Sequence, residues 1–454
     1  MTRYAATFTC VFIATFAAGA YAQNSSQADE SGFVKWAKQA SLPLSTVTPG
    51  SSWQDLRPLG KIIGNATVVA LSEAPHLAAE PLEFRNRLLQ YLVQEKGFTA
   101  IAIESGIVEG RTVHDYVRGG PGDLPTVVAQ GIGWNWDRLP QNHALVRWLR
   151  DYNADPRHTH KINFYGFDVP GSPGDPRANR GMDTALTAAL EYLVKVDSAS
   201  AAGIHARVDA FLTNIRFDPH RAADSPGYDR LSQSERDVLT AAIADLISLL
   251  ERKEAQYTAA SSASDYQWAY RAAIGARQAD EWLRQIPLGE SVAADEKDRA
   301  MADNLDWIIT QEGVGGKILV FGARYHLSKA PIATNLPVPA GAAQSPQEVA
   351  GTYLSRRLGD RLLTIGNLIG KGSVGCGDST HTLRQVPPES IAGLAGEVGA
   401  PLYVLDLRAA PAPVASWLNQ EHPLGQEGIV LNLAFGRAFD VLFYLDAVTP
   451  ACGT

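Results

Sequence analysis

Residues 66–76 read ATVVALSEAPH: a short apolar run, Ala66 to Leu71, is followed at once by Glu73 and His76. Apolar runs of five or six residues are typical of strands that are covered on both faces. Such a strand favours a parallel sheet flanked by helices, and these sheets bind ligands outside the carboxyl ends of their strands. The stretch therefore predicts both a fold class and the edge of the sheet where chemistry takes place.

Three further apolar runs also lead to ionisable side chains. TAIAI at 99–103 ends at Glu104, KINFY at 161–165 is followed by Asp168, and KILVF at 317–321 precedes Arg324, Tyr325 and His326. Helical patterns separate the runs, and this alternation is typical of βα units around a mostly parallel sheet flanked by helices. Because such strands end at one edge, we expect these side chains to share a site with Glu73 and His76. Later runs at 362–368, 402–407 and 441–445 extend the sheet.

The chain of 454 residues is long for one compact domain, so an insertion is expected. Between Gly181 and Ile286 the sequence has long amphipathic stretches without strand signals. One of them begins with Ser232 and has Glu235 three residues later, which predicts a capping box. We interpret this block as an all-helical insertion that forms a cap or wall over the active cleft. The expected division is a signal peptide at 1–22, a leader packing on the body at 23–58, the α/β core at 59–175 and 297–454, and the insertion at 176–296.

Composition and the first residues limit the class of protein. A formal net charge of −8 argues against nucleic acid as a partner. Arg3 precedes an apolar run and Ala20-Tyr21-Ala22, which fits the small-x-small pattern of a signal-peptide cleavage site. The run is too short for a membrane span. We therefore expect cleavage after Ala22, a periplasmic or secreted location and no membrane span afterwards, and the oligomeric state is left open.

Two cysteines, Cys376 and Cys452, follow the expected cleavage site, because Cys10 lies within the signal peptide. In an oxidising compartment the pair is consistent with one disulfide and equally with two unpaired thiols. Cys376 belongs to the glycine-rich stretch 372–377, which lacks the Lys-Ser/Thr of a phosphate loop. That stretch is interpreted as a mobile surface loop.

Glu73 and His76 are the first candidates for catalysis. A carboxylate beside an imidazole holds the ring in place and raises its basicity, so that it can take a proton from water. Pro75 restricts the conformation of the loop between them. Taken alone, the pair is more typical of a solvated surface loop, and E-x-x-H pairs that bind metal usually lie on a helix. Its place after a strand favours the catalytic interpretation.

Arg85 is the second unusual residue. In the helix predicted from Pro81 to Lys96 it falls on the apolar stripe, where a guanidinium needs a carboxylate or a substrate oxygen as partner. Glu104 is a candidate partner, and the alternative is an arginine that reaches solvent at the rim of the core. The sequence has no G-x-S-x-G turn, so a nucleophilic serine of that type is not expected.

The order of these motifs resembles the erythromycin-esterase family. That family has a Gly-Glu-x-x-His-Gly motif, a helix with an acidic residue and an arginine, and a Gly-Phe-x-x-(apolar)-x-Glu strand. The resemblance covers roughly residues 60 to 451. The matching segments are SEAPHL at 72–77, Glu80 with Arg85, GFTAIAIE at 97–104, WLRDYN at 148–153, YGFD at 165–168, KDRAMADNLDW at 297–307, the strand before His326, and FDVLFYLDAVTPA at 439–451.

The resemblance implies a hydrolase that cleaves a small-molecule lactone or other carboxylic ester without a metal or another cofactor. It implies that His76, backed by Glu73, acts as the general base on water, and that Glu104 and His326 complete the catalytic set. The side chains expected to bind substrate are those of Arg85, Arg324, Tyr325 and Asp168.

Departures from the family pattern keep other hypotheses open. Ser72 and Leu77 replace both glycines of the first motif, and Ala323 stands where the family's Ala-His-Asn-x-His segment has its first histidine. A macrolide substrate is therefore one candidate among several esters. One alternative is a periplasmic ligand-binding protein of the same fold without turnover. Another is a metal-dependent hydrolase whose ligands are Glu73, His76, Glu104 and His326.

Overall fold

The computed structural model describes residues 27–452 except 135, 172–180, 213–226, 339–342, 344, 427, 429 and 431. The predicted signal peptide at 1–22 lies outside the described residues. In the described part of the chain no helix is both long enough and apolar enough to cross a membrane.

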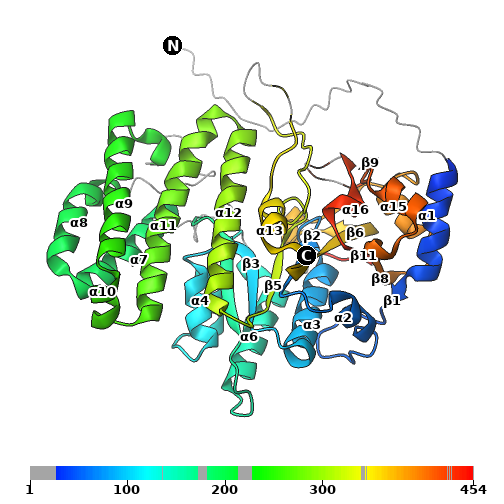
Figure 1. Ribbon diagram of the computed structural model, residues 1–454, viewed down its shortest axis with the longest axis horizontal. Coiled ribbons are helices and arrows are strands. Elements are labelled where there is room, and N and C mark those ends of the chain that lie inside the picture. Colours follow the sequence, from blue (N-terminus) through cyan, green and yellow to red (C-terminus); the bar gives the residue numbers. More distant parts are fainter. Residues whose placement is uncertain are drawn as a thin grey trace.

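A mostly parallel sheet runs through the centre of the molecule, with helices on both faces (Figure 1). The six strands from β11 to β4 are parallel to one another, whereas β8 and β1 add an antiparallel margin. The predicted fold class is confirmed. In spatial order the strands are β1 (Leu42–Pro43), β8 (Leu402–Asp406), β11 (Val441–Val448), β6 (Leu362–Val374), β2 (Val68–Glu73), β5 (Ile318–Ala323), β3 (Ala100–Gly106) and β4 (Asn163–Asp168), and β7 (His381–Thr382) pairs with the end of β6.

The apolar runs form strands because both faces of the sheet are covered. In β2, Val68 and Ala70 pack into one hydrophobic cluster and Val69 and Leu71 into another on the opposite face, as the alternation of side chains along a strand requires. The second cluster contains the helices α2 (Arg57–Ile63), α3 (Ala79–Lys96), α4 (Gly110–Val117), α5 (Leu124–Gly131) and α6 (Pro140–Ala154).

The opposite face is covered by two groups of helices. The N-terminal helix α1 (Gln27–Ala40) packs there through Phe33, whose ring lies 5.1 Å from that of Trp417. The first group shares a hydrophobic cluster with α1 and comprises α14 (Ile391–Gly396), α15 (Ala412–Leu418) and α16 (Phe435–Ala438), with the small sheet of β9 (His422–Pro423) and β10 (Asn432–Leu433) nearby. The helix α13 (Ala350–Leu358) belongs to the other cluster on this face and covers the strands near β2.

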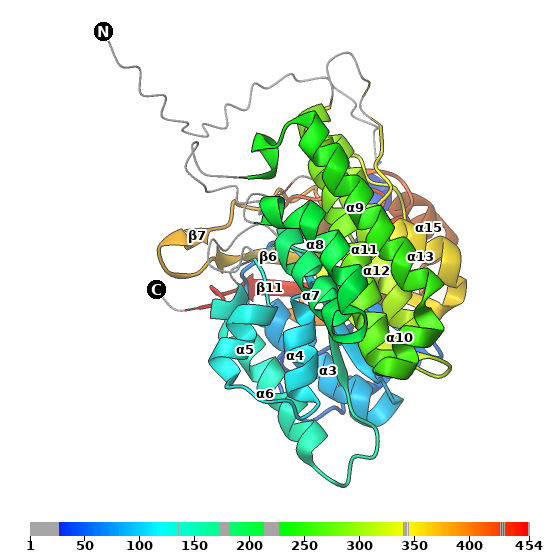
Figure 2. The same ribbon diagram turned by 90° about the vertical axis from the view of Figure 1, so that its left-hand side faces the viewer.

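A bundle of long helices lies at the β4 end of the sheet (Figures 1 and 2). The predicted capping box is confirmed: the Ser232 hydroxyl accepts from the Glu235 amide, and the Glu235 carboxylate accepts from the Ser232 amide. The bundle helix α12 continues past residue 296 and packs on β4 and α13. The bundle comprises α7 (Gly181–Val196), α8 (Ser198–Leu212), α9 (Gln233–Arg252), α10 (Glu254–Ala260), α11 (Ala263–Gln285) and α12 (Glu290–Glu312).

The neighbouring strands β2 and β5 have connections that run in opposite directions. After β2 the chain passes through α3 to β3, beyond β5, whereas after β5 it passes through α13 to β6, beyond β2. The helices α3 and α13 lie on opposite faces, because they belong to different clusters. In open α/β sheets a crevice opens outside the carboxyl ends of strands at such a reversal, and ligands bind there.

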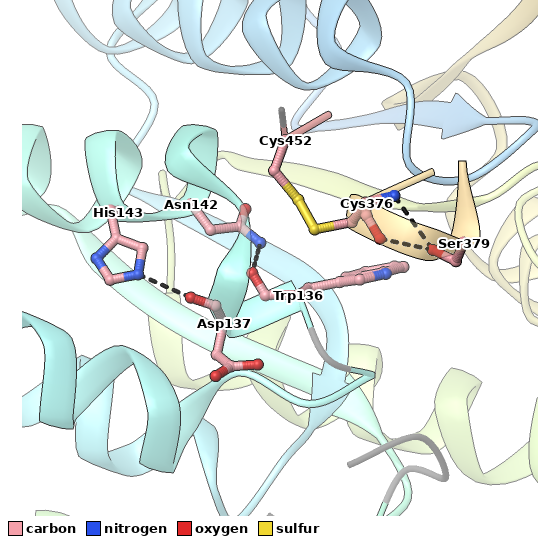
Figure 3. Close-up of a disulfide and its surroundings, with 7 residues drawn as sticks. All are labelled: Trp136, Asp137, Asn142, His143, Cys376, Ser379 and Cys452. Carbon is pink, nitrogen blue, oxygen red and sulfur yellow. Dashed lines mark hydrogen bonds between the residues drawn. A yellow bond between two sulfur atoms is a disulfide. The ribbon is translucent and has the colours of Figure 1, made fainter. Parts of the chain in front are cut away.

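The glycine-rich stretch 372–377 is not a mobile surface loop, and that prediction was wrong. Its first residues belong to β6, which extends to Val374 and pairs with β7. Cys376 then forms a disulfide with Cys452, with the two Cα atoms 4.9 Å apart (Figure 3). Of the two alternatives that the sequence left open for these cysteines, the structure has the disulfide.

Candidate active site

Parallel pairing brings the predicted carboxylates to one edge of the sheet. Glu73, the last residue of β2, pairs in register with Ala323, the last residue of β5. Glu104 lies at an irregularity of β3, and Asp168 ends β4 opposite Gly106. These three carboxylates therefore occupy the carboxyl ends of three strands, as expected from the apolar runs that precede them. His326 follows β5 by a few residues and reaches the same edge.

His76 forms a hydrogen-bonded pair with Glu73. Nδ1 of His76 lies 2.9 Å from Oε2 of Glu73, and the carboxylate is 1 % exposed whereas the imidazole is 43 % exposed. The buried partner fixes the orientation of the ring. Nε2 of His76 makes no hydrogen bond to any residue that the structure describes, so it is available to water or substrate.

The charge on His76 is stabilised by its surroundings. Partial burial lowers the pKa of His76, but the negative charge of Glu73, the hydrogen bond that the imidazole donates to Glu73 and the more distant charge of Glu104 raise it to about 9. The ring of Trp136 packs on the imidazole, with the two centroids 5.4 Å apart. In the absence of substrate His76 is therefore an imidazolium at neutral pH.

Glu104 contacts His326 and acts on His76 through its charge. Its Oε2 accepts a hydrogen bond of 2.6 Å from the Ala323 amide, and its Oε1 lies 3.5 Å from Nε2 of His326. Burial raises the pKa of Glu104, but the positive charges of His326, His76 and Lys297 together lower it below its usual value. Gly322 leaves room for the Glu104 carboxylate in this place, because a Cβ at residue 322 would stand only 3.1 Å from Oε2 of Glu104.

His326 has a second carboxylate partner that the sequence reasoning did not single out. Nδ1 of His326 lies 2.8 Å from Oδ1 of Asp298, which comes from α12 and is fully buried. The same oxygen accepts the Ala350 amide at the start of α13. Burial lowers the pKa of His326, but Asp298 and Glu104 raise it above its usual value. The site thus contains two histidine–carboxylate pairs with Glu104 near both.

Lys297, the residue before Asp298, was also missed. Its Nζ lies 3.1 Å from Oδ2 of Asp168, with side-chain exposures of 11 % and 0 %. The ring of Trp134 lies under the same ammonium at 4.6 Å, and its Nε1 donates to Asp168 at 3.2 Å. Burial lowers the pKa of Lys297, but Asp168 and Glu104 raise it above its usual value. Asp168 is therefore held by a buried cation.

Arg85 does not pair with Glu104 as expected. Its guanidinium donates to Oδ1 of Asn86 at 3.0 and 2.8 Å and lies over the ring of Phe321 at 4.9 Å. Burial lowers the pKa of Arg85 to about 10, and the charge of Glu73 opposes this shift. Arg85 has no exposed surface. Arg85 therefore supplies positive charge near Glu73 from within the core, because the apolar face of α3 packs against the sheet.

The polar groups of Arg324 and Tyr325 are paired with neighbouring residues, and the Tyr325 ring packs on that of His326 with the two centroids 4.7 Å apart. Arg324 donates to the Asn367 carbonyl at 3.1 Å and to Gln426 at 2.6 Å, and the Tyr325 hydroxyl donates to Gln347 at 2.9 Å. Both are buried, and Asp168 and Arg85 are fully buried. Substrate binding by these four side chains stays a prediction, and their placement in this conformation does not support direct contact.

Two further features bear on what the site can bind. Among the described residues no group of three or more His, Cys, Asp or Glu side chains is arranged to hold a metal ion. A cavity of about 330 Å³ lies elsewhere, between α4, α7 and α11, and is lined by Arg111, Trp268 and Arg271 among others. None of the predicted site residues lines that cavity.

A parallel α/β sheet with two histidine–carboxylate pairs at its carboxyl edge is an arrangement that can perform acid–base chemistry. Residues 93–448 match the model of the family described as erythromycin esterase, and the chain belongs to this family, which makes it a hydrolase of the esterase type. The match contains Glu104, Lys297, Asp298 and His326, whereas Glu73 and His76 precede it.

Several known proteins are similar to this chain in sequence or in fold. An erythromycin esterase type II of Escherichia coli is 28 % identical over 315 residues, which cover 66 % of this chain and 70 % of that protein. A crystal structure of a Bacillus cereus protein superposes with a TM-score of 0.76 at 25 % identity and covers 93 % of this chain and 98 % of the other. A mutant of the erythromycin esterase EreC in its open conformation shares the fold, with a TM-score of 0.66 at 14 % identity over 90 % and 97 % of the two chains.

Proposed function

We propose that this chain hydrolyses a lactone or another carboxylic ester, with His76 as the general base that activates water. The observation that carries the proposal is the pairing of a buried Glu73 with a half-exposed His76, because Nδ1 makes the hydrogen bond to Glu73 and Nε2 is left available to water or substrate. Family membership supports the ester class. A positioned base of this kind typically accelerates hydrolysis by about 10²–10⁴-fold.

The second pair has a complementary task in this proposal. Neutral His76 takes a proton from water, and the resulting hydroxide attacks the acyl carbon. When the tetrahedral intermediate collapses, the C–O bond to the leaving alkoxide breaks, and the imidazolium of His326 gives the alkoxide a proton from Nε2. Asp298 keeps His326 charged and oriented, and Glu104 lies close enough to Nε2 to steady that proton. The products are a carboxylic acid and an alcohol.

The substrates that fit this proposal are macrolides, simpler lactones and linear esters. Macrolides are candidates because a relative is named erythromycin esterase type II. This chain has its own geometry at the positions that depart from the family pattern. Leu77 adopts a φ of 65°, a conformation that favours glycine, and Ala323 offers only its backbone amide to Glu104. Simpler lactones and linear esters are therefore equal candidates.

Export is also part of the proposal. Two observations support it: the signal-peptide pattern ending at Ala22 and the disulfide between Cys376 and Cys452. Disulfides form and persist in oxidising compartments such as the bacterial periplasm. A periplasmic or secreted ester hydrolase is consistent with both.

A mass-spectrometric screen of the purified protein against macrolides, simpler lactones and linear esters tests the reaction class. We expect a lactone product whose mass equals substrate plus water, or the acid and alcohol of a linear ester, and no product with His76→Ala. The screen is run with and without exhaustive chelation, and we expect the same product in both arms. Product lost on chelation and restored by added metal would favour the metal-dependent alternative. Binding without product would favour the ligand-binding alternative.

The pH dependence of kcat/KM tests the role of His76. With a pKa of about 9, roughly one His76 in a hundred is neutral at pH 7. We therefore expect kcat/KM to rise about tenfold per pH unit below this pKa and to level off above it. Glu73→Gln removes the negative charge that raises the pKa of His76. The midpoint of the kcat/KM profile should therefore move down toward about 6.5, the ordinary pKa of histidine, and the value of kcat/KM above the midpoint should be lower.

The measurement covers pH 6 to 10, with His76→Ala as the blank for spontaneous ester hydrolysis. A midpoint that stays in place in Glu73→Gln would show that another group controls the rate.

A further inference from the structure

The disulfide lies next to the loop that carries His76. It joins Cys376, which follows β6, to Cys452, which follows β11, and the two cysteines also form a β-bridge. We infer that the Cys376–Cys452 disulfide is a positioning device for His76, because it fixes the two strand ends that hold the backbone directly after the imidazole. The inference rests on the proposed role of His76 as general base.

Hydrogen bonds connect the disulfide to the His76 loop. The carbonyl of Leu77 accepts the Gly375 amide at 3.0 Å and the Ala451 amide at 2.9 Å, and each donor is the residue directly before one of the cysteines. The Ala451 amide also reaches the Gly375 carbonyl at 3.2 Å. The disulfide therefore holds in place both amides that donate to the Leu77 carbonyl.

The backbone conformation of Leu77 needs hydrogen bonds of this kind to hold it. Its φ of 65° lies in the left-handed region, where the Cβ of any residue except glycine is crowded. A residue persists in that region when its surroundings over-determine it. Leu77 and both cysteines pack on the same hydrophobic cluster, and that cluster contains Trp136. Figure 3 shows Trp136 among the residues around the disulfide, and its ring also packs on His76.

The segment before Cys452 is bound along the start of α3 as well. Ala78 and Pro450 form a β-bridge, and the Ala79 amide donates to the Thr449 carbonyl at 2.9 Å. The Glu80 carboxylate accepts both the amide and the hydroxyl of Thr449 at 2.8 Å. The chain on the C-terminal side of His76 is thus packed continuously against a segment that ends at the disulfide.

The disulfide itself contributes no charge to His76. The charged groups that act on the imidazole are Glu73 on β2, Glu104 on β3 and Lys297 on α12. None of them lies on the segments that carry the cysteines. A change in the titration of His76 after removal of the disulfide must therefore come from a change in geometry, above all in the contact between His76 and the fixed carboxylate of Glu73.

The test is a histidine NMR titration of the full chain in the Cys376→Ala/Cys452→Ala variant, with signals assigned through His76→Ala and His326→Ala. We expect the titration midpoint of His76 to fall by about one pH unit toward the ordinary value. The midpoint of His326, which depends on Asp298 and Glu104, should not move. For an ester found in the screen, kcat should fall about tenfold with little change in KM.

The control is Ser379→Ala, which removes the two hydrogen bonds between the Ser379 hydroxyl and the Cys376 backbone and leaves the disulfide intact. It should titrate as the unaltered protein does. If the double variant does not fold, reduction of the native protein under conditions that preserve its circular dichroism replaces it. An unchanged His76 midpoint, or an equal shift of both histidines, would overturn the inference. The titration needs no substrate, so it still tests the inference if the ester screen yields no product.

Discussion

Replacement of His76 with alanine should lower kcat/KM for ester hydrolysis by about 10²–10⁴-fold, the usual worth of a positioned general base. The imidazole is half-exposed and makes its hydrogen bond through Nδ1 to Glu73, so its removal takes away the base without opening a large cavity. The loss should appear in kcat, because the base acts on water in the chemical step. Steady-state kinetics above pH 9, where the native imidazole is neutral, measure the largest difference.

His160→Ala is the matched control for this prediction. His160 is exposed and its ring contacts only the neighbouring Thr159 hydroxyl among the hydrogen bonds of the described residues. We expect native kinetics from it. Native kcat in His76→Ala, with the fold confirmed by circular dichroism, would remove His76 from the mechanism and leave His326 as the base to test.

Replacement of Lys297 with methionine should lower the free energy of unfolding by about 3–5 kcal/mol, because it leaves the carboxylate of Asp168 buried without its cation. Asp168 has no exposed surface, and Lys297 is its charge partner at 3.1 Å. The hydrogen bonds from Trp134 and from the Val169 amide remain, and they replace only part of the lost interaction. Urea unfolding followed by circular dichroism measures the difference.

Two controls accompany this variant. Lys297→Met with Asp168→Asn removes both charges, and we expect it to regain most of the lost stability. Lys253→Met removes a partly exposed partner of Asp197 at 2.6 Å, and such a surface pair contributes only about 0–1 kcal/mol. Equal losses in the single and double Lys297 variants would show that packing around Lys297, and not the buried charge, explains the effect.

The sheet could be predicted from the sequence because its strands are buried on both faces. The run from Val68 to Leu71 has no polar side chain and every residue in it is buried, so its strand character does not depend on tertiary detail. The same reasoning placed Glu73 and Glu104 at one edge, since they follow directly on such runs. Strand order could not be predicted, because nothing in these runs indicates that β5 enters between β2 and β3.

Lys297 and Asp298 show where sequence reasoning missed a signal that was present. On α12 they share a helical face with the buried Met301 and Leu305, so two charges lie on an apolar stripe. That is the same signal that drew attention to Arg85. What the stripe faces is decided by the packing of α12 on β4 and α13, and Asn304 of this helix donates to the Asp168 carbonyl at 3.2 Å.

The position of β5 also has a consequence for how the chain acquires its shape. During synthesis β2 and β3 are made early, and the whole helical bundle is made before β5. Until β5 arrives, each of the two earlier strands presents an unpaired edge in what will become the middle of the sheet. Such edges promote aggregation in partly folded chains. Native pairing at the heart of this protein is therefore a late, long-range event, and early protection of those edges favours a good yield.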